Sequence, residues 1–160
     1  MATATAALPL QIRRDDLRDP RIEAFMREHL ADMHRTSPPE SVHALDMGAL
    51  RRPEIEFFTA WSDDTLVATG AIKRLDAERA ELKSMRTAES WRGRGAGRQV
   101  LAHLIRHAQR LGLSQLLLET GTAPFFDPAV ALYRRYGFTD CGPFADYRLD
   151  PHSRYMVKTL

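Results

Sequence analysis

The sequence predicts a single α/β domain built around a mixed sheet. Segments with the alternating pattern of strands and segments with helical spacing follow one another along the chain. No Gly/Ser-rich linker, internal repeat or low-complexity block interrupts residues 10–160, and 160 residues with 44% hydrophobic residues fit one core. We therefore expect a domain over 10–160, preceded by a flexible Ala/Thr-rich lead-in at 1–9.

The first half of the chain is expected to hold a strand, two helices and a hairpin. Alternation predicts a strand at 10–14, and Asp15 and Asp16 follow it at positions that favour a helix N-cap. Apolar residues three and four apart then predict a helix that ends before Ser37-Pro38-Pro39, because proline cannot continue it. The remaining predicted elements are a helix at 41–50 and hairpin strands at 56–61 and 65–75, joined by a Ser-Asp-Asp turn.

The second half alternates strands and helices. A strand is predicted at 79–87, and a change to helical spacing predicts a helix at 97–111 that ends at Gly112. A short apolar run predicts a buried strand at 115–119, and a second helix follows at 129–136. The last strands are predicted at 138–141 and 155–158.

The cysteine content and the hydropathy limit the compartment. Cys141 is the only cysteine, so an intramolecular disulfide and a CxxC metal or redox pair are excluded, and Cys141 is expected to be a small core filler. This content fits a reducing cytoplasm. The first ten residues lack the pattern of a secretory signal, and no stretch approaches the roughly 18 apolar residues of a membrane span. We expect a cytoplasmic protein without a membrane partner.

The charge is nearly balanced overall but uneven along the chain. A net charge of +2, from 23 Lys and Arg against 21 Asp and Glu, argues against a general nucleic-acid binder. Between Glu89 and Glu119, however, there is no acidic residue, while five arginines and two histidines occur there. This local excess predicts an anionic ligand or partner. His29, His103 and His107 are expected on helix surfaces or edges, and no grouping has metal-ligand spacing, so no metal is expected.

A glycine-rich turn, Arg92-Gly93-Arg94-Gly95-Ala96-Gly97-Arg98, lies between a predicted strand and a predicted helix. Glycine permits positive φ and close approach of a ligand, and the N–H groups at a helix start attract anions. Together with three arginines, this pattern predicts a pyrophosphate site. A P-loop is excluded because no Gly-Lys-Ser/Thr triplet is present, and a GxGxxG fingerprint from Gly93 would need glycine in place of Arg98. The alternative is a plain turn with solvated arginines.

The turn resembles the R/QxxGxG/A signature of the GNAT N-acetyltransferase superfamily, as Arg92-x-x-Gly95-x-Gly97. Downstream, LYRRYGF at 132–138 is similar to the family's LYxxxGF segment. Four more segments resemble a small bacterial subfamily: SPPESVHALD (37–46), ELKSMRT (81–87), LETG (118–121) and DYRLDPHSRYM (146–156). The resemblance implies a mostly antiparallel twisted sheet flanked by helices over 10–160, and an acetyl-CoA-dependent N-acetyltransferase working by direct attack in a ternary complex.

The resemblance also implies an acetyl-CoA site. In the family, backbone amides of the turn bind the pyrophosphate, and the preceding strand pairs with the pantetheine arm and polarises the thioester carbonyl. Many members carry an asparagine shortly before the active-site tyrosine, where this chain has Phe126, so that side-chain contact is not expected. The implied CoA-binding residues are Met85, Thr87, Arg92, Gly93, Arg94, Gly95, Ala96, Gly97 and Arg98.

Two residues are implied as catalytic. Glu81 stands at the offset before Arg92 where some members place the glutamate that deprotonates the amine, directly or through water. A strand-surface carboxylate paired with Lys83 or Arg79 is the alternative. Tyr133 matches the tyrosine whose hydroxyl faces the CoA sulfur, and a phenol is protonated at neutral pH and can supply a proton to a thiolate. Its alternative is an aromatic on the buried face of a helix.

The acceptor is expected to be a small amine bound next to the segment 37–46, which in the family shapes the acceptor pocket. Ser37, Glu40, Ser41 and His43 are its polar candidates. Lys83 and Arg86 would bind a carboxylate or phosphate and so favour an anionic acceptor, unless they are simply solvated.

Two other functions are kept open. A non-catalytic acyl-CoA-binding sensor would retain the turn and lose turnover. A nucleic-acid-binding module would use the basic stretch 92–110, although the chain lacks a basic face interleaved with aromatic residues. Exposed final strands make a homodimer a further expectation.

Overall fold

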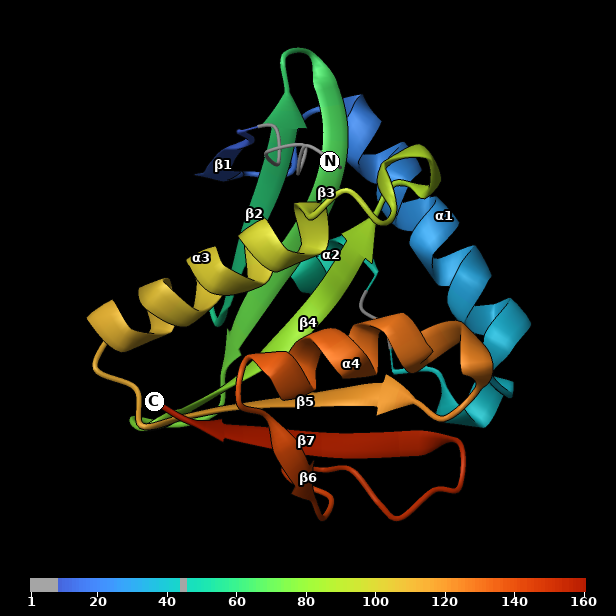
Figure 1. Ribbon diagram of the computed structural model, residues 1–160, viewed down its shortest axis with the longest axis vertical. Helices are drawn as coiled ribbons and strands as arrows, with labels where there is room; N and C mark the ends of the chain where they lie inside the picture. Colours follow the sequence, from blue (N-terminus) through green and yellow to red (C-terminus); the bar gives the residue numbers. More distant parts are fainter. Residues whose placement is uncertain (1–8, 44–45) are drawn as a thin grey trace, which may run out of the picture.

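The computed structural model describes residues 9–43 and 46–160. Its seven-stranded sheet has the order β1-β2-β3-β4-β5-β7-β6, and all neighbouring strands are antiparallel except β4 and β5 (Figure 1). This confirms the mixed, mostly antiparallel sheet. The strands are β1 (Gln11–Arg14), β2 (Ile55–Ser62), β3 (Thr65–Arg74), β4 (Arg79–Thr87), β5 (Gln115–Gly121), β6 (Thr139–Cys141) and β7 (Ser153–Thr159).

Helices cover both faces of the sheet. The helices are α1 (Pro20–Thr36), α2 (Met47–Leu50), α3 (Ala96–Arg110) and α4 (Asp127–Arg135), with 3-10 turns η1 (Pro39–Ser41), η2 (Glu89–Trp91) and η3 (Pro124–Phe126). Apolar side chains of α3 and α4 pack on one face, and those of α1 and α2 pack on the other (Figure 1). In the described part of the chain, no helix is long and apolar enough to cross a membrane.

Two predictions near the N-terminus are wrong. The expected helix at 41–50 is instead the turn η1 and the short helix α2, capped by the Asp46 carboxylate, which accepts from Ala49 N; residues 44 and 45 lie outside the described residues. The cap of α1 is Asp19, not Asp15 or Asp16, whose carboxylates close turns by accepting from Leu17 N and Arg18 N. Of the expected lead-in, only residue 9 is described.

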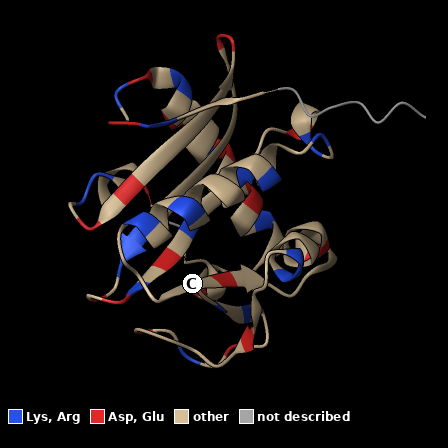
Figure 2. Cartoon of the chain, turned by 60° about the vertical axis from the view of Figure 1, so that its left-hand side comes forward, with Lys and Arg blue, Asp and Glu red and all other residues tan. Residues whose placement is uncertain are grey.

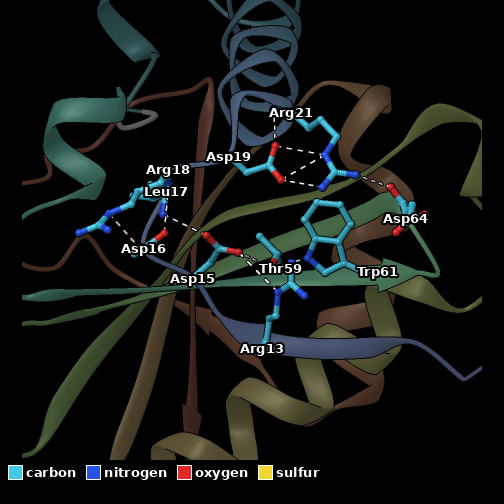
Figure 3. A network of polar contacts seen from close by, with 10 residues as sticks. All are labelled: Arg13, Asp15, Asp16, Leu17, Arg18, Asp19, Arg21, Thr59, Trp61 and Asp64. Carbon is cyan, nitrogen blue, oxygen red and sulfur yellow. Dashed lines mark hydrogen bonds and ion pairs between the residues drawn. The ribbon is translucent and has the colours of Figure 1, made fainter.

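A polar network joins β1 to the start of α1 (Figure 3). The Trp61 indole N–H donates to Thr59 Oγ1 (2.8 Å), and the Thr59 hydroxyl donates to Asp15 Oδ2 (3.1 Å). The guanidinium groups of Arg13 and Arg21 lie over the Trp61 ring, 4.8 and 4.5 Å from its centre. This network anchors the N-terminal end of α1 to β2.

Strands β4 and β5 separate along their length, and among the described residues this leaves one edge of β4 unpaired. These parallel strands pair only over 79–82 and 115–118, after which they diverge (Figure 1). A bulge lies in the diverging part of β4, where Ser84 has φ of +56° and its carbonyl accepts from the Thr69 hydroxyl (2.8 Å). In the described chain no strand pairs with this edge of β4 between Lys83 and Thr87, so its backbone groups face the space between the strands.

Candidate active site

A cavity of about 1210 Å³ occupies the space between the diverging strands. Its wall is built from the second half of β4, the glycine turn, the first turn of α3, the end of β5 and the start of α4. The volume exceeds the upper end of pockets for drug-sized ligands, about 1,000 Å³. It therefore admits an elongated ligand together with a second, smaller one.

All the sequence-predicted CoA-binding residues line this cavity, and so do Glu81 and Tyr133. Of the predicted acceptor-binding residues, the structure brings in Ser37, Ser41, His43, Lys83 and Arg86. Glu40 is solvent-exposed and does not line the cavity, because η1 turns its side chain outward.

The glycine turn has the backbone geometry of an anion site. Gly93 and Gly95 have φ of +74° and +85°, and Gly95 is the N-cap of α3, so no side chain caps the first N–H groups of this helix. A Cβ on Gly97 would lie 3.4 Å from Thr87 Oγ1, so a larger residue would close the gap between α3 and β4. These features fit a bound pyrophosphate.

Aromatic side chains hold the arginines of this turn. The Arg94 guanidinium lies 3.9 Å from the centre of the Trp91 ring, and that of Arg92 lies 5.6 Å from the Phe125 ring. Charge is distributed over the whole molecule in Figure 2, but α3 carries three arginines and no acidic residue. The local basic excess expected from the sequence therefore gathers at the turn and along the helix that it opens.

Tyr133 lies at the buried face of α4 and borders the cavity. Its ring packs edge-on against Phe138, with centroids 5.7 Å apart, and no described residue hydrogen-bonds its hydroxyl. Burial raises the pKa of the Tyr133 hydroxyl well above its usual range, so it stays protonated at neutral pH. Tyr133 thus has the packing role that was one alternative from the sequence, and its role as a proton donor stays a prediction.

Phe126 fills the place where the family pattern expects an asparagine. Its ring lies directly over Gly121 at the end of β5, where any Cβ would overlap the ring at 2.1 Å. The departure from the pattern therefore gives an apolar contact that joins η3 to β5. No polar side chain from this position enters the cavity.

Glu81 is buried in the cavity wall and already bonded. Its Oε2 accepts from Lys83 Nζ (3.1 Å) and from the Tyr147 hydroxyl (2.5 Å), and its side chain is 3% exposed. Lys83 Nζ also donates to the Tyr147 oxygen (2.9 Å). Burial and the nearby Glu81 carboxylate raise the pKa of Tyr147, which therefore remains a hydrogen-bond donor. The pairing of Glu81 with Lys83, anticipated as an alternative, occurs inside the site rather than on a solvated surface.

We expect Glu81→Gln to lower the free energy of unfolding by about 3 kcal/mol, because removing one partner of a buried pair leaves Lys83 uncompensated. Urea unfolding followed by circular dichroism measures the change. The matched control is Glu23→Gln, which removes an exposed α1 carboxylate paired with Arg27 and should change stability by less than about 0.5 kcal/mol. Equal free energies of unfolding for the two variants would contradict a stabilising contribution of Glu81 to the buried pair.

Arg86 and His29 occupy the α1 side of the cavity. The Arg86 guanidinium is paired with Asp32 and lies 3.5 Å from Glu28, while its buried Nε has no partner among the described residues. Burial, and secondarily the Arg86 charge, lower the pKa of His29 to about 4. The expectation of His29 on a helix surface is wrong: its face of α1 packs on β4, and the side chain is buried.

The burial of neutral His29 predicts a loss of stability in mild acid. The unfolded chain, with a His pKa of about 6.5, binds a proton that the folded chain does not bind until its pKa of about 4, so stability falls as pH drops through this window. We expect His29→Gln to reduce that fall by about 1–3 kcal/mol in urea titrations across the window. His34→Gln, at an exposed position of α1, should leave the pH dependence unchanged.

Two hydrogen bonds tie the segment 37–43 to other parts of the chain beside the cavity. The Ser41 hydroxyl donates to Asp150 Oδ2 (2.5 Å), and His43 Nδ1 is hydrogen-bonded to Glu119 Oε2. Glu119 stands at the end of β5 and also accepts from Ser153 (3.3 Å). Burial raises the pKa of the Glu119 carboxyl, an effect that His43 opposes.

Four residues of this region were missed from the sequence: Glu119, Tyr147, Asp150 and Ser153. Each lies in a segment that resembles the bacterial subfamily, LETG or DYRLDPHSRYM, but neither segment has a local chemical motif. Their approach to the segment 37–43 and to Glu81 depends on the β5–β7 pairing, since Glu119 lies opposite Tyr155, and on the loop before β7. The only signal in the sequence was the resemblance of these two segments to the bacterial subfamily.

Comparison with known proteins decides the family. The model of the acetyltransferase (GNAT) family matches residues 14–138, which include the diverging strands, the glycine turn and Tyr133. The chain belongs to the GNAT family. The expectation of an acyltransferase is thereby confirmed, and the match extends over most of the domain predicted at 10–160.

Two bacterial GNAT relatives match almost the whole chain. YedL of Escherichia coli, described as an uncharacterised N-acetyltransferase, is 47% identical over 93% of this chain and 94% of its own length. YsnE of Bacillus subtilis, described in the same way, is 46% identical over 94% of this chain and 100% of its own length. An IAA acetyltransferase of Azospirillum brasilense is 41% identical over 82% of this chain and 84% of its own length.

Solved structures share the GNAT fold. A proposed acyl-CoA N-acyltransferase of Klebsiella pneumoniae superposes with a TM-score of 0.77 at 26% identity, over 94% of this chain and 97% of that one. A Bacillus subtilis acetyltransferase in complex with CoA superposes with a TM-score of 0.67 at 18% identity, over 95% and 99% of the two chains. The fold expected from the family resemblance is confirmed.

Proposed function

We propose that this GNAT protein transfers the acetyl group of acetyl-CoA to the amine of a small acceptor. The observation that carries the proposal is the glycine turn, which opens α3 with uncapped N–H groups at one end of the cavity between β4 and β5. Tyr133 lies on the same cavity wall. An anion site, an open strand edge and a proton donor on one cavity wall match the three parts of acetyl-CoA: pyrophosphate, pantetheine arm and thioester.

Acetyl-CoA supplies an activated acyl group whose thiol leaves as a thiolate. In this proposal the turn from Arg92 to Arg98 binds the pyrophosphate through backbone N–H groups, and the free edge of β4 from Met85 to Thr87 orients the pantetheine arm and the carbonyl oxygen. Tyr133 donates a proton to the leaving sulfur. Deprotonation of the acceptor ammonium needs a base, and the cavity wall offers Glu81 and His43.

The acceptor pocket lies between the segment 37–43 and the diverging strands. Lys83 is bonded to Glu81 and Tyr147, whereas Arg86 has a buried Nε without a partner among the described residues. We propose a small amine that carries at most one carboxylate, bound near Arg86. Because the Azospirillum relative is named an IAA acetyltransferase, IAA is included among the compounds to be tested.

A panel of amines tests the proposed function. Purified protein is incubated with acetyl-CoA and, separately, amino acids, aryl amines, polyamines and IAA, while release of free CoA thiol is followed and products are checked by mass spectrometry. We expect thiol release that depends on at least one small amine and a product heavier by one acetyl group. Tight acetyl-CoA binding without turnover across the panel would instead support the non-catalytic acyl-CoA sensor.

A further inference from the structure

The acceptor end of the cavity holds a connected polar cluster drawn from four distant segments. It consists of Glu81, Lys83, Tyr147, His43, Glu119 and Ser153. Two of its members are carboxylates, and they have different hydrogen-bond partners. Glu81 is bonded to Lys83 and Tyr147, whereas Glu119 is bonded to the His43 ring and to Ser153.

Glu81 is poorly placed to accept a proton from an incoming amine. Its Oε2 accepts two hydrogen bonds, one of them from the Lys83 ammonium, and the side chain is 3% exposed. The oxygen that faces Lys83 and Tyr147 is therefore already occupied by two donors inside a buried ion pair, and little of the carboxylate is open to an incoming amine. Protonating Glu81 would also leave Lys83 as an uncompensated buried charge.

His43 has the opposite arrangement. Its side chain is 32% exposed and lines the cavity, while Nδ1 faces Glu119, whose side chain is 14% exposed. The edge of the ring packs on Tyr147 with centroids 5.0 Å apart, so two neighbours fix its orientation. Among the described residues nothing hydrogen-bonds Nε2. A histidine held by a carboxylate through Nδ1–H presents a basic Nε2 and gains stabilisation when it becomes an imidazolium.

Resting on the proposed function, we infer that His43 is the base for the acceptor amine and that Glu119 is its positioning residue. The N–H bond of the acceptor ammonium breaks, a new N–H bond forms at His43 Nε2, and the nitrogen lone pair becomes free to attack. The imidazolium charge is balanced by the Glu119 carboxylate. Glu81 then has a structural role, holding Lys83 and Tyr147 behind the His43 ring.

Kinetics of matched variants test this assignment. We expect His43→Gln to lower kcat by about 100-fold with unchanged acetyl-CoA affinity, and added imidazole to restore at least a tenth of the activity of His43→Ala. Glu119→Gln should lower kcat by about tenfold. The control is His34→Gln, on the exposed face of α1, which should stay within about threefold of the wild type. Folded Glu81→Gln distinguishes the two candidate bases and should lose less activity than His43→Gln. Activity of His43→Gln within threefold of the wild type, or loss of activity confined to Glu81→Gln, would overturn the inference.

A measurement on the free protein separates failure of the inference from failure of the proposed function. In ¹⁵N-histidine NMR spectra we expect His43 as the Nδ1–H tautomer, with a downfield, slowly exchanging Nδ1 proton that Glu119→Gln abolishes. Absence of that proton in the wild type would overturn the pairing whatever the activity. If the proton is present but no amine is acetylated, the proposed function fails while the His43–Glu119 pair stands.

Discussion

Replacing Tyr133 with Phe should lower kcat by about 10²–10³-fold, because the leaving thiolate then loses the hydroxyl proposed to protonate it. The substitution removes one oxygen that no described residue binds and keeps the edge-on contact with Phe138, so the fold should be unchanged. Acetyl-CoA affinity should also be unchanged, since the hydroxyl acts on the departing sulfur rather than on the bound thioester. Steady-state kinetics and isothermal titration measure the two quantities separately.

Tyr136→Phe is the control for this prediction. Tyr136 follows one turn later at the end of α4, is half-buried and lies outside the main cavity. Its variant should keep the kcat of the wild type within about threefold. If Tyr133→Phe weakens acetyl-CoA binding as much as it lowers kcat, the residue is a packing residue and another group protonates the thiolate.

Replacing Gly93 with Asp should weaken acetyl-CoA binding by about tenfold to hundredfold. An aspartate at the turn places a negative charge beside the proposed pyrophosphate, and two like charges about 4 Å apart repel by about 1 kcal/mol in water and about 4 kcal/mol near a protein surface. A side chain at the positive φ of Gly93 carries some backbone strain, but its Cβ meets no atom within 4 Å, and Asp enters the left-handed region more readily than most residues.

Gly93→Asn isolates the charge. Asparagine has the same shape and the same tolerance of positive φ, so it reproduces the backbone cost without the carboxylate. Titrations with acetyl-CoA at low and high salt should show a large difference between the two variants that shrinks as salt rises. Equal affinities of the Asp and Asn variants would place the anion elsewhere.

The strands and the two long helices could be predicted because their signals are local. The change from alternating to helical spacing at the turn places α3 within one residue of its position in the structure, and 79–87 is the full extent of β4. Hydrophobic periodicity reports directly on which side chains face the core. The divergence of β4 from β5 has no such signal, because it depends on where pairing between two distant segments stops.

The segment 41–50 and the N-cap of α1 were mispredicted for a physical reason. Several carboxylates near the start of α1 could serve as cap, and Asp19 is selected by the proline at the first helical position together with its bond to Arg21. Around residue 43 the chain follows side-chain bonds from Ser41 and His43 to other segments rather than its own helical propensity. Such tertiary contacts override local preference.

The glycine turn could be predicted from the sequence, whereas the region around His43 and Glu81 could be predicted only in part. The glycine turn is one contiguous motif whose chemistry follows from glycine conformation and helix polarity, so its residues were foreseen. The proposed acceptor end is assembled from bonded residues up to 109 positions apart, and its ion pairs decide which groups are free to react. The sequence identified Glu81, Lys83 and His43 as polar candidates, but only their partners show that Lys83 is compensated and that His43 is backed by Glu119.

Isothermal titration of the full-length protein with acetyl-CoA tests the central claim most directly. The geometry of the glycine turn and the open edge of β4 predict one site per chain with a Kd in the micromolar range, competed by free CoA and weakened much more by Gly93→Asp than by Gly93→Asn. A folded sample that shows no heat of binding at hundreds of micromolar acetyl-CoA would contradict it.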